Sequence, residues 1–261
     1  MLSAHKGVYK QEKNQLPSFE LQRQYEKILD ALTDQRKGIS TAGVSLPSVE
    51  NVEKPIPVEM TYYTIATIGE AVTNILTELN KQKHDLDRSI SDQRHPTNLE
   101  NDKKTLRDVE MKIEKINEYC NGLLHEFAKT LSRSRGEAVA EEEPLKLYEL
   151  KEHFENVQDG FTAQRQGAYM PAFDYLPDGR SMAQVELSYR ALVGMSYAVE
   201  SYLAHLVKEN AELEESRYHS ERNHLNDETR LTQIQREVER IQTNCAPSLR
   251  KLVEQFTPRS K

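Results

Sequence analysis

The sequence predicts an all-α protein: an elongated helical bundle or coiled coil with an antiparallel helical hairpin and a very long C-terminal helix. Charged residues make up 30% of the 261 residues and hydrophobic residues 37%, a balance typical of long charged helices. Trp is absent, and only 10 glycines and 10 prolines interrupt the chain. Apolar residues recur three and four positions apart in each long segment, which is the spacing of a helix that lies along another helix.

The charge and cysteine content restrict the partners and the compartment. The formal net charge is −7, from 42 acidic and 35 basic residues, and no basic face is segregated, so no nucleic-acid partner is expected. No apolar run approaches the roughly 20 residues of a membrane-spanning helix. The N-terminus lacks the apolar segment of a signal peptide, and two cysteines are too few for a disulfide framework. We therefore expect a reducing, cytoplasmic location.

The N-terminal part predicts one short helix between two irregular segments. Residues 1–17 form a polar arm, and residues 18–37 form a helix with Ser18 as N-cap that ends near Gly38. Residues 38–60 contain three prolines and two glycines and show no usable period, which predicts a linker. The helix has one apolar stripe, formed by Leu21, Tyr25, Ile28 and Leu32.

An antiparallel helical hairpin is predicted over residues 61–135. Pro96 ends the first helix, and Thr97 with Glu100 forms a capping box that opens the second. Two long helices joined by a short connection pack face to face. Gly122, inside the second helix, indicates a close approach of another helix or a local bend. The hairpin seam consists of Ile65, Ile68, Val72, Ile75, Leu79, Val109, Ile113, Ile116, Leu123 and Phe127.

Residues 136–180 are predicted to contain a charged loop, a short helix and a turn segment. Pro144 suits the first turn of the helix. The turn segment contains prolines, glycines and aromatic residues, and its Pro177-Asp178-Gly179 step is a turn signal. The aromatic residues either fix this loop onto the bundle or form a recognition patch. No segment shows strand alternation of useful length, so no sheet is expected.

Residues 181–258 are predicted to form the very long C-terminal coiled-coil helix. Ser181 and Gln184 match a capping box, and the segment from there to Phe256 contains one glycine and one proline. The apolar stripe changes phase within residues 214–230, which predicts a stutter, a bend or a short break.

The terminal stripe of this helix is the predicted partner interface. At about 1.5 Å per residue the helix would be longer than either arm of the hairpin, so the stripe has no obvious partner within the chain. An uncovered apolar stripe is an aggregation hazard, which predicts that a partner or a second copy covers it. The interface residues are Leu231, Ile234, Val238, Ile241, Leu249, Leu252 and Phe256.

No residue pattern predicts catalysis. Phosphate-binding glycine loops, the G-x-S-x-G elbow and the helical H-E-x-x-H zinc motif are all absent from the sequence. Cys120 and Cys245 occupy apolar stripes, where a free cysteine behaves as a small buried hydrophobic residue. We therefore predict no catalytic, cofactor-binding or metal-binding residues, no cofactor and no enzymatic activity.

The leading functional hypothesis is a structural or adaptor coiled-coil subunit of a larger cytoplasmic protein assembly. It would bind protein partners through its coiled-coil seams or associate with itself. The alternative is a helical bundle that binds or remodels a membrane surface. Binding to anionic lipids needs a polybasic surface, however, and no helix face in the sequence concentrates Lys and Arg.

Overall fold

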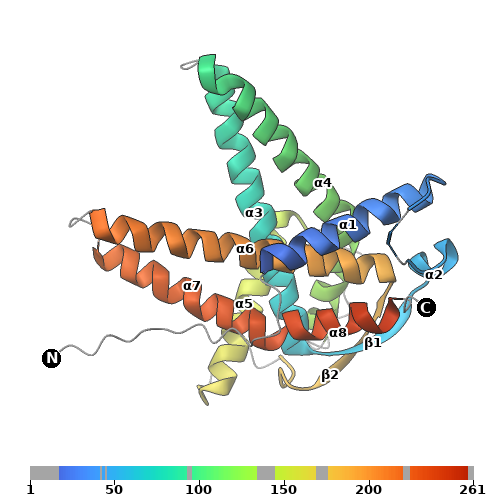
Figure 1. The fold of residues 1–261 in the computed structure, drawn as a ribbon. Helices are drawn as coiled ribbons and strands as arrows, with labels where there is room; N and C mark the ends of the chain where they lie inside the picture. The colour runs from blue at the N-terminus through green and yellow to red at the C-terminus, as the bar shows by residue number, and fades with distance from the viewer. Residues whose placement is uncertain are drawn as a thin grey trace.

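The computed structural model is mostly helical, with a small antiparallel sheet of two strands (Figure 1). The N-terminal arm and most of the predicted charged loop lie outside the residues that the structure describes. The described residues are 18–41, 43–44, 46–92, 96–133, 145–168, 176–219 and 224–257.

The N-terminal helix α1 (Ser18–Arg36) packs against α6 (Tyr189–His219) and matches the prediction for residues 18–37. The predicted linker, however, contains a short helix α2 (Val49–Glu53) and a strand β1 (Ile56–Thr61). In β1 the buried Val58 and Met60 alternate with exposed residues. Such alternation is typical of a strand with one face on the core, and three prolines nearby obscured it.

The hairpin consists of α3 (Tyr62–Asp92) and α4 (Pro96–Arg133), which run antiparallel. Polar pairs connect the two helices along their length: Lys83 Nζ lies 2.7 Å from Glu110 Oε1, and Ser89 Oγ donates to Asp102 Oδ2 at 2.9 Å. The side chain of Thr97, which belongs to the predicted capping box, lies outside the described side chains.

Close helix approaches occur at two glycines other than Gly122. A Cβ atom on Gly122 would meet nothing within 4 Å, so the predicted close approach there is wrong. A Cβ atom on Gly69 of α3 would lie 2.3 Å from the Phe154 ring, and one on Gly194 would lie 2.4 Å from Tyr119 Cβ. These two positions let α3 and α6 pack tightly against their neighbours.

The helix α5 (Leu147–Arg165) packs on α3 and is followed by the strand β2 (Met182–Leu187). β2 pairs antiparallel with β1, with Val185 opposite Val58. The predicted capping box at Ser181 and Gln184 is therefore wrong, as is the expectation of no sheet. Alternate β2 side chains, Ala183, Val185 and Leu187, are buried against the core.

The predicted single helix over 181–258 is wrong. After β2 the chain forms α6 (Tyr189–His219), α7 (His224–Asn244) and α8 (Ala246–Phe256). α7 folds back along α6, where Arg230 Nε and Nη2 donate to Glu209 at 2.7 and 2.8 Å. α6 ends at His219 and α7 begins at His224, within the polar stretch where the apolar stripe changes phase. Pro247, which has no N–H to donate, lies at the start of α8.

Both hairpins project from a common body, the α3–α4 hairpin upward and the α6–α7 hairpin to the left in Figure 1. The body contains the hydrophobic core, to which residues from α1 through α8 and both strands contribute. Cys120 and Cys245 are free and fully buried in it, as their positions in the apolar stripes predicted. Burial raises the pKa of the Cys120 thiol to about 12.

Candidate functional site

The residues of the predicted partner interface are buried, fully or in part, in the core of the protein itself. Its premise, an apolar stripe without an intramolecular partner, is wrong because α7 and α8 turn back and pack on α6 and α3. Leu252 and Phe256 are partly buried against the core. The remaining interface residues are at most 5% exposed: Leu231, Ile234, Val238, Ile241 and Leu249.

The predicted hairpin-seam residues all contribute to the hydrophobic core. Ile113 and Leu123 are partly buried against it. α3 also packs on α5, α6 and α7, so several of its seam residues face more than one helix. The fully buried members are Ile65, Ile68, Val72, Ile75, Leu79, Val109, Ile116 and Phe127.

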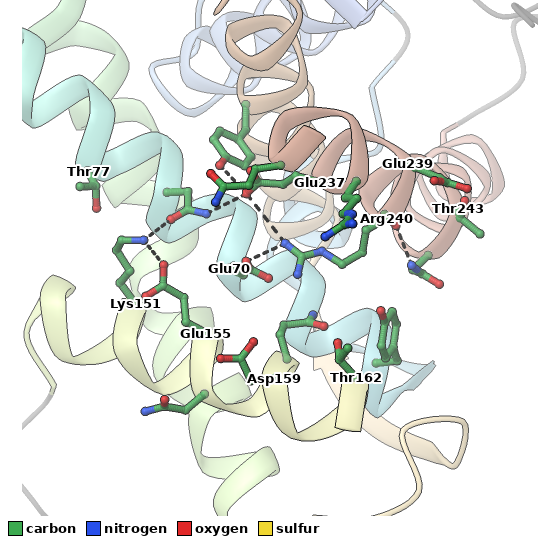
Figure 2. A pocket seen from close by; sticks show the side chains of 18 of the residues that line it. Glu70, Thr77, Lys151, Glu155, Asp159, Thr162, Glu237, Glu239, Arg240 and Thr243 are labelled. Carbon is green, nitrogen blue, oxygen red and sulfur yellow. Dashed lines mark hydrogen bonds and ion pairs between the residues drawn. The ribbon is translucent and has the colours of Figure 1, made fainter. Parts of the chain in front are cut away.

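Polar side chains from four helices surround a cleft of about 910 Å³ between α3, α5 and α7, with α6 contributing at one side (Figure 2). We call it the polar cleft, and its central residues are Glu70, Asn74, Lys151, Asp159 and Arg240. A hydrogen-bond network crosses its wall. Arg240 Nη2 donates to Glu70 Oε1 at 2.6 Å, and Lys151 Nζ donates to Asn74 Oδ1 at 2.6 Å.

Glu237 of α7 connects the same network to α6 and α3. Its Oε1 accepts a hydrogen bond from Tyr202 Oη at 2.6 Å and another from Asn74 Nδ2 at 3.2 Å. Arg240 Nη2 lies 3.8 Å from the same oxygen. Lys151 also pairs with Glu155 on its own helix. The polar cleft thus joins α3, α5, α6 and α7 through side chains.

Burial changes the ionisation of the acid at the centre of the polar cleft. Glu70 is 7% exposed, and desolvation raises the pKa of its carboxyl from the ordinary 4.5 to about 7, although Arg240 acts in the opposite direction. Burial and the charge of Glu237 also raise the pKa of Tyr202. A carboxyl with a shifted pKa in a cleft is typical of a functional site.

Several buried polar atoms in the cleft wall have no hydrogen-bond partner among the described residues: Glu70 Oε2, Gln158 Oε1 and Arg240 Nε. The other end of the Gln158 amide is satisfied, because Nε2 donates to Thr67 Oγ1 at 2.8 Å. Buried polar groups in folded proteins normally have partners, so these atoms need an explanation.

A second hollow of about 420 Å³ lies between the two projecting hairpins, and we call it the inter-arm groove. Ile75, Leu79 and Leu86 of α3 form its apolar part, and α6 forms the other side through residues such as His205 and Glu212. Its lining contains five acidic and two basic side chains: Glu78, Asp85, Asp102, Glu209 and Glu212 against Lys81 and Lys208.

Sequence reasoning missed the polar cleft because it treated charged residues on helices as solvated surface. One signal was available: Glu70 is the only charged residue between Tyr62 and Glu78, a stretch that is otherwise apolar or neutral. A lone carboxylate in such a stretch is expected to have a buried partner. Arg240 and Glu237, by contrast, stand among many charged neighbours and gave no such signal.

No family model matches the chain, and no match was found among curated proteins or solved structures. Within the described ranges, no helix is long and apolar enough to cross a membrane. No group of three or more His, Cys, Asp or Glu side chains that could hold a metal ion occurs in that part of the chain. The protein is a mostly helical bundle with a small two-stranded sheet.

Proposed function

We propose that this protein is a non-enzymatic structural or adaptor subunit that binds other proteins through helix–helix interfaces on its projecting hairpins. The observation that carries the proposal is the burial along the α3–α4 hairpin. After residue 79 of α3, every described side chain of that helix is exposed or half-buried. The same is true of the described side chains of α4 before residue 109. We call residues 80–92 and 96–108 the α3–α4 arm.

The α3–α4 arm has the pattern of a two-helix coiled coil. Leu86 and Ile90 of α3 are half-buried four positions apart, and residues 87–89 between them are exposed. Leu106 of α4 is also half-buried. Two helices alone cover only one stripe on each other, which leaves room for a third helix along the pair. Most helical stability in proteins comes from such packing.

The inter-arm groove supports one class of partner, a basic amphipathic helix. An amphipathic helix lays its apolar face into a groove and presents charge at the rim. The half-buried Leu86 supplies the apolar contact here, next to the buried Leu79, and the lining has three more acidic than basic side chains. Electrostatic complementarity of this kind steers association and selects the partner.

Affinity purification of the tagged chain from its native cells, read by quantitative mass spectrometry, tests the proposal. The double variant Asp85→Lys and Glu212→Lys reverses charge in the groove. The matched control Asp87→Lys and Glu215→Lys reverses exposed charges on the same helices outside it. We expect stoichiometric recovery of a helical protein with the natural chain and the control, and its loss with the groove variant.

Two results would contradict the proposal. Equal recovery with both double variants would exclude the groove as the interface. Recovery of the bait alone, with a monomer mass in light scattering, would argue against an adaptor role. In that case, binding to anionic vesicles that added salt abolishes would favour the membrane-surface alternative.

A further inference from the structure

We propose that the polar cleft binds a small aliphatic amine of the polyamine class, in its ammonium form. This site adjoins the inter-arm groove, with which it shares Glu78 and His205, but its central residues lie outside the groove. The inference does not depend on the proposed adaptor function. The inference comes from the cations that the cleft already holds, its unpaired oxygen atoms and the arrangement of its carboxylates.

The wall of the polar cleft already binds cationic groups of the chain itself. The Lys151 ammonium donates to Asn74 Oδ1 at 2.6 Å and to Glu155, and the Arg240 guanidinium donates to Glu70 Oε1 at 2.6 Å. The acceptor oxygens belong to α3 and α5, so these two helices jointly present oxygen atoms to cations in the cleft. An added ammonium would meet the same chemistry.

The cleft also has hydrogen-bond acceptors that the chain leaves unused. Glu70 is 7% exposed and Gln158 is 2% exposed, and one side-chain oxygen of each has no partner among the described residues. Asp159, the next residue of α5, is exposed in the cleft and forms no ion pair with a described residue. A buried acceptor without a donor is unfavourable, so a donor that enters from the cleft is favoured.

The carboxylates are arranged around one space. Glu70 on α3 and both Glu155 and Asp159 on α5 line the polar cleft (Figure 2), and Glu155 is close enough to Glu70 to raise the pKa of its carboxyl. An ammonium offers three donors in a compact group, which suits acceptors from separate helices, whereas a guanidinium prefers both oxygens of one carboxylate. The Arg240 guanidinium reaches one Glu70 oxygen only, so an ammonium suits the remaining acceptors better.

The size of the polar cleft favours a chain with several ammonium groups. A volume of about 910 Å³ is far larger than one ammonium needs. Two further acids of the lining, Glu78 on α3 and Glu239 on α7, form no ion pair with a described residue. Of the five basic side chains of the lining, Lys151, Arg230 and Arg240 are already paired with acids of the chain. The carboxylates of the lining lie on different helices. In a polyamine, methylene segments hold the ammonium groups apart, so that each group can meet a different carboxylate.

Glu70 makes this binding pH-dependent. Because burial raises the pKa of Glu70 to about 7, its carboxylate is fully ionised only above that pH. A bound ammonium favours the ionised form, so affinity is highest above pH 7 and decreases as pH falls through 7. The charged or titratable groups around Glu70 are Lys151, Glu155 and Asp159 of α5, Tyr202 of α6, and Glu237 and Arg240 of α7.

Isothermal titration of the full chain with spermidine at pH 8, at constant ionic strength, tests the inference. Diacetylated spermidine, which lacks the primary ammonium groups, is the control ligand. Asp159→Asn removes an acceptor at an exposed position, and Glu152→Gln on the same helix, outside the cleft, is the matched control. We expect saturable binding that Asp159→Asn weakens by about tenfold, the usual size of one charged hydrogen bond.

The result expected from the control variant is unchanged affinity for spermidine, and the diacetylated ligand should give no saturable heat. The inference would be overturned by the absence of saturable binding at millimolar spermidine. It would also be overturned by equal weakening in Asp159→Asn and Glu152→Gln, because that result would indicate general attraction to an acidic protein. Circular dichroism of both variants verifies that the fold is intact.

Discussion

The two halves of α3 have the same apolar spacing and very different surroundings. All side chains from residue 63 to residue 76 are buried, because α4, α5, α6 and α7 pack around this half. From residue 80 onward the described side chains of the same helix are exposed or half-buried, and the helix lies in the α3–α4 arm. The number of neighbouring helices, and not the stripe itself, therefore decides how deeply a residue is buried.

Polar residues show the same difference. In the buried half, Thr67 Oγ1 donates to Tyr63 O at 2.8 Å and Thr73 Oγ1 donates to Gly69 O at 3.0 Å, so their hydroxyls are satisfied within the helix. In the arm, Lys83 and Glu110 form an exposed pair whose contribution is screened by water. A polar substitution should therefore be costly in the first half and tolerated in the second.

The largest expected effect is the loss of core packing at Ile68, which is 0% exposed. We expect Ile68→Ala to reduce the free energy of unfolding by about 2–5 kcal/mol, because the cavity adds to the lost burial. Urea denaturation followed by circular dichroism measures this difference. A change below about 1 kcal/mol would contradict the packing of four helices around this half.

The next largest effect on stability is expected at Glu70, which also lies in the buried half of α3. Because its pKa is about 7 in the folded chain and the ordinary value is 4.5, the folded state binds the proton more tightly. This tighter proton binding stabilises the folded state. The stabilisation is fully present below pH 4.5, and it is lost as pH rises through 7. By the relation between pKa and free energy it amounts to about 3 kcal/mol.

We expect Glu70→Gln to remove this pH dependence and Asp87→Asn, an exposed control in the arm, to retain it. Denaturation at a series of pH values between 4.5 and 8 compares both variants with the natural chain. Parallel pH profiles for the natural chain and Glu70→Gln would show that Glu70 does not titrate in this range.

A smaller effect is expected at the close helix approach of Gly194. A Cβ atom there would lie 2.4 Å from Tyr119 Cβ, so Gly194→Ala should destabilise the protein by about 1–3 kcal/mol through overpacking. Gly122→Ala is the matched control, because nothing lies within 4 Å of its added Cβ atom. The control should increase stability by up to about 1 kcal/mol, the usual helix preference for Ala. Destabilisation by both variants would refute this contrast.

The smallest effect is expected in the arm itself. Leu86 is half-buried on α3, so Leu86→Ala should cost about 1 kcal/mol, well below the cost at Ile68. The same urea denaturation measures both variants. An equal cost at the two positions would mean that the arm is covered as fully as the body.

The hairpin shows what local information predicts well. Its apolar stripe and the proline that begins its second helix are both local signals, and α3 and α4 lie within the predicted 61–135. The strands show the opposite case. The β2 alternation extends over only six residues, and its partner β1 is far away in the chain, so neither segment indicates the other. A short pattern of this kind cannot be distinguished from a helix start.

The sequence by itself determined that the chain is mostly helical and that a hairpin follows the N-terminal segment, because both depend on contacts between residues close in the chain. Only the tertiary structure decided that α7 folds back and buries the stripe from Leu231 to Ile241. It also decided that Glu70 of α3 meets Arg240 of α7, which creates the polar cleft. These contacts join distant segments, and an apolar or charged stripe specifies that it needs a partner but not which one.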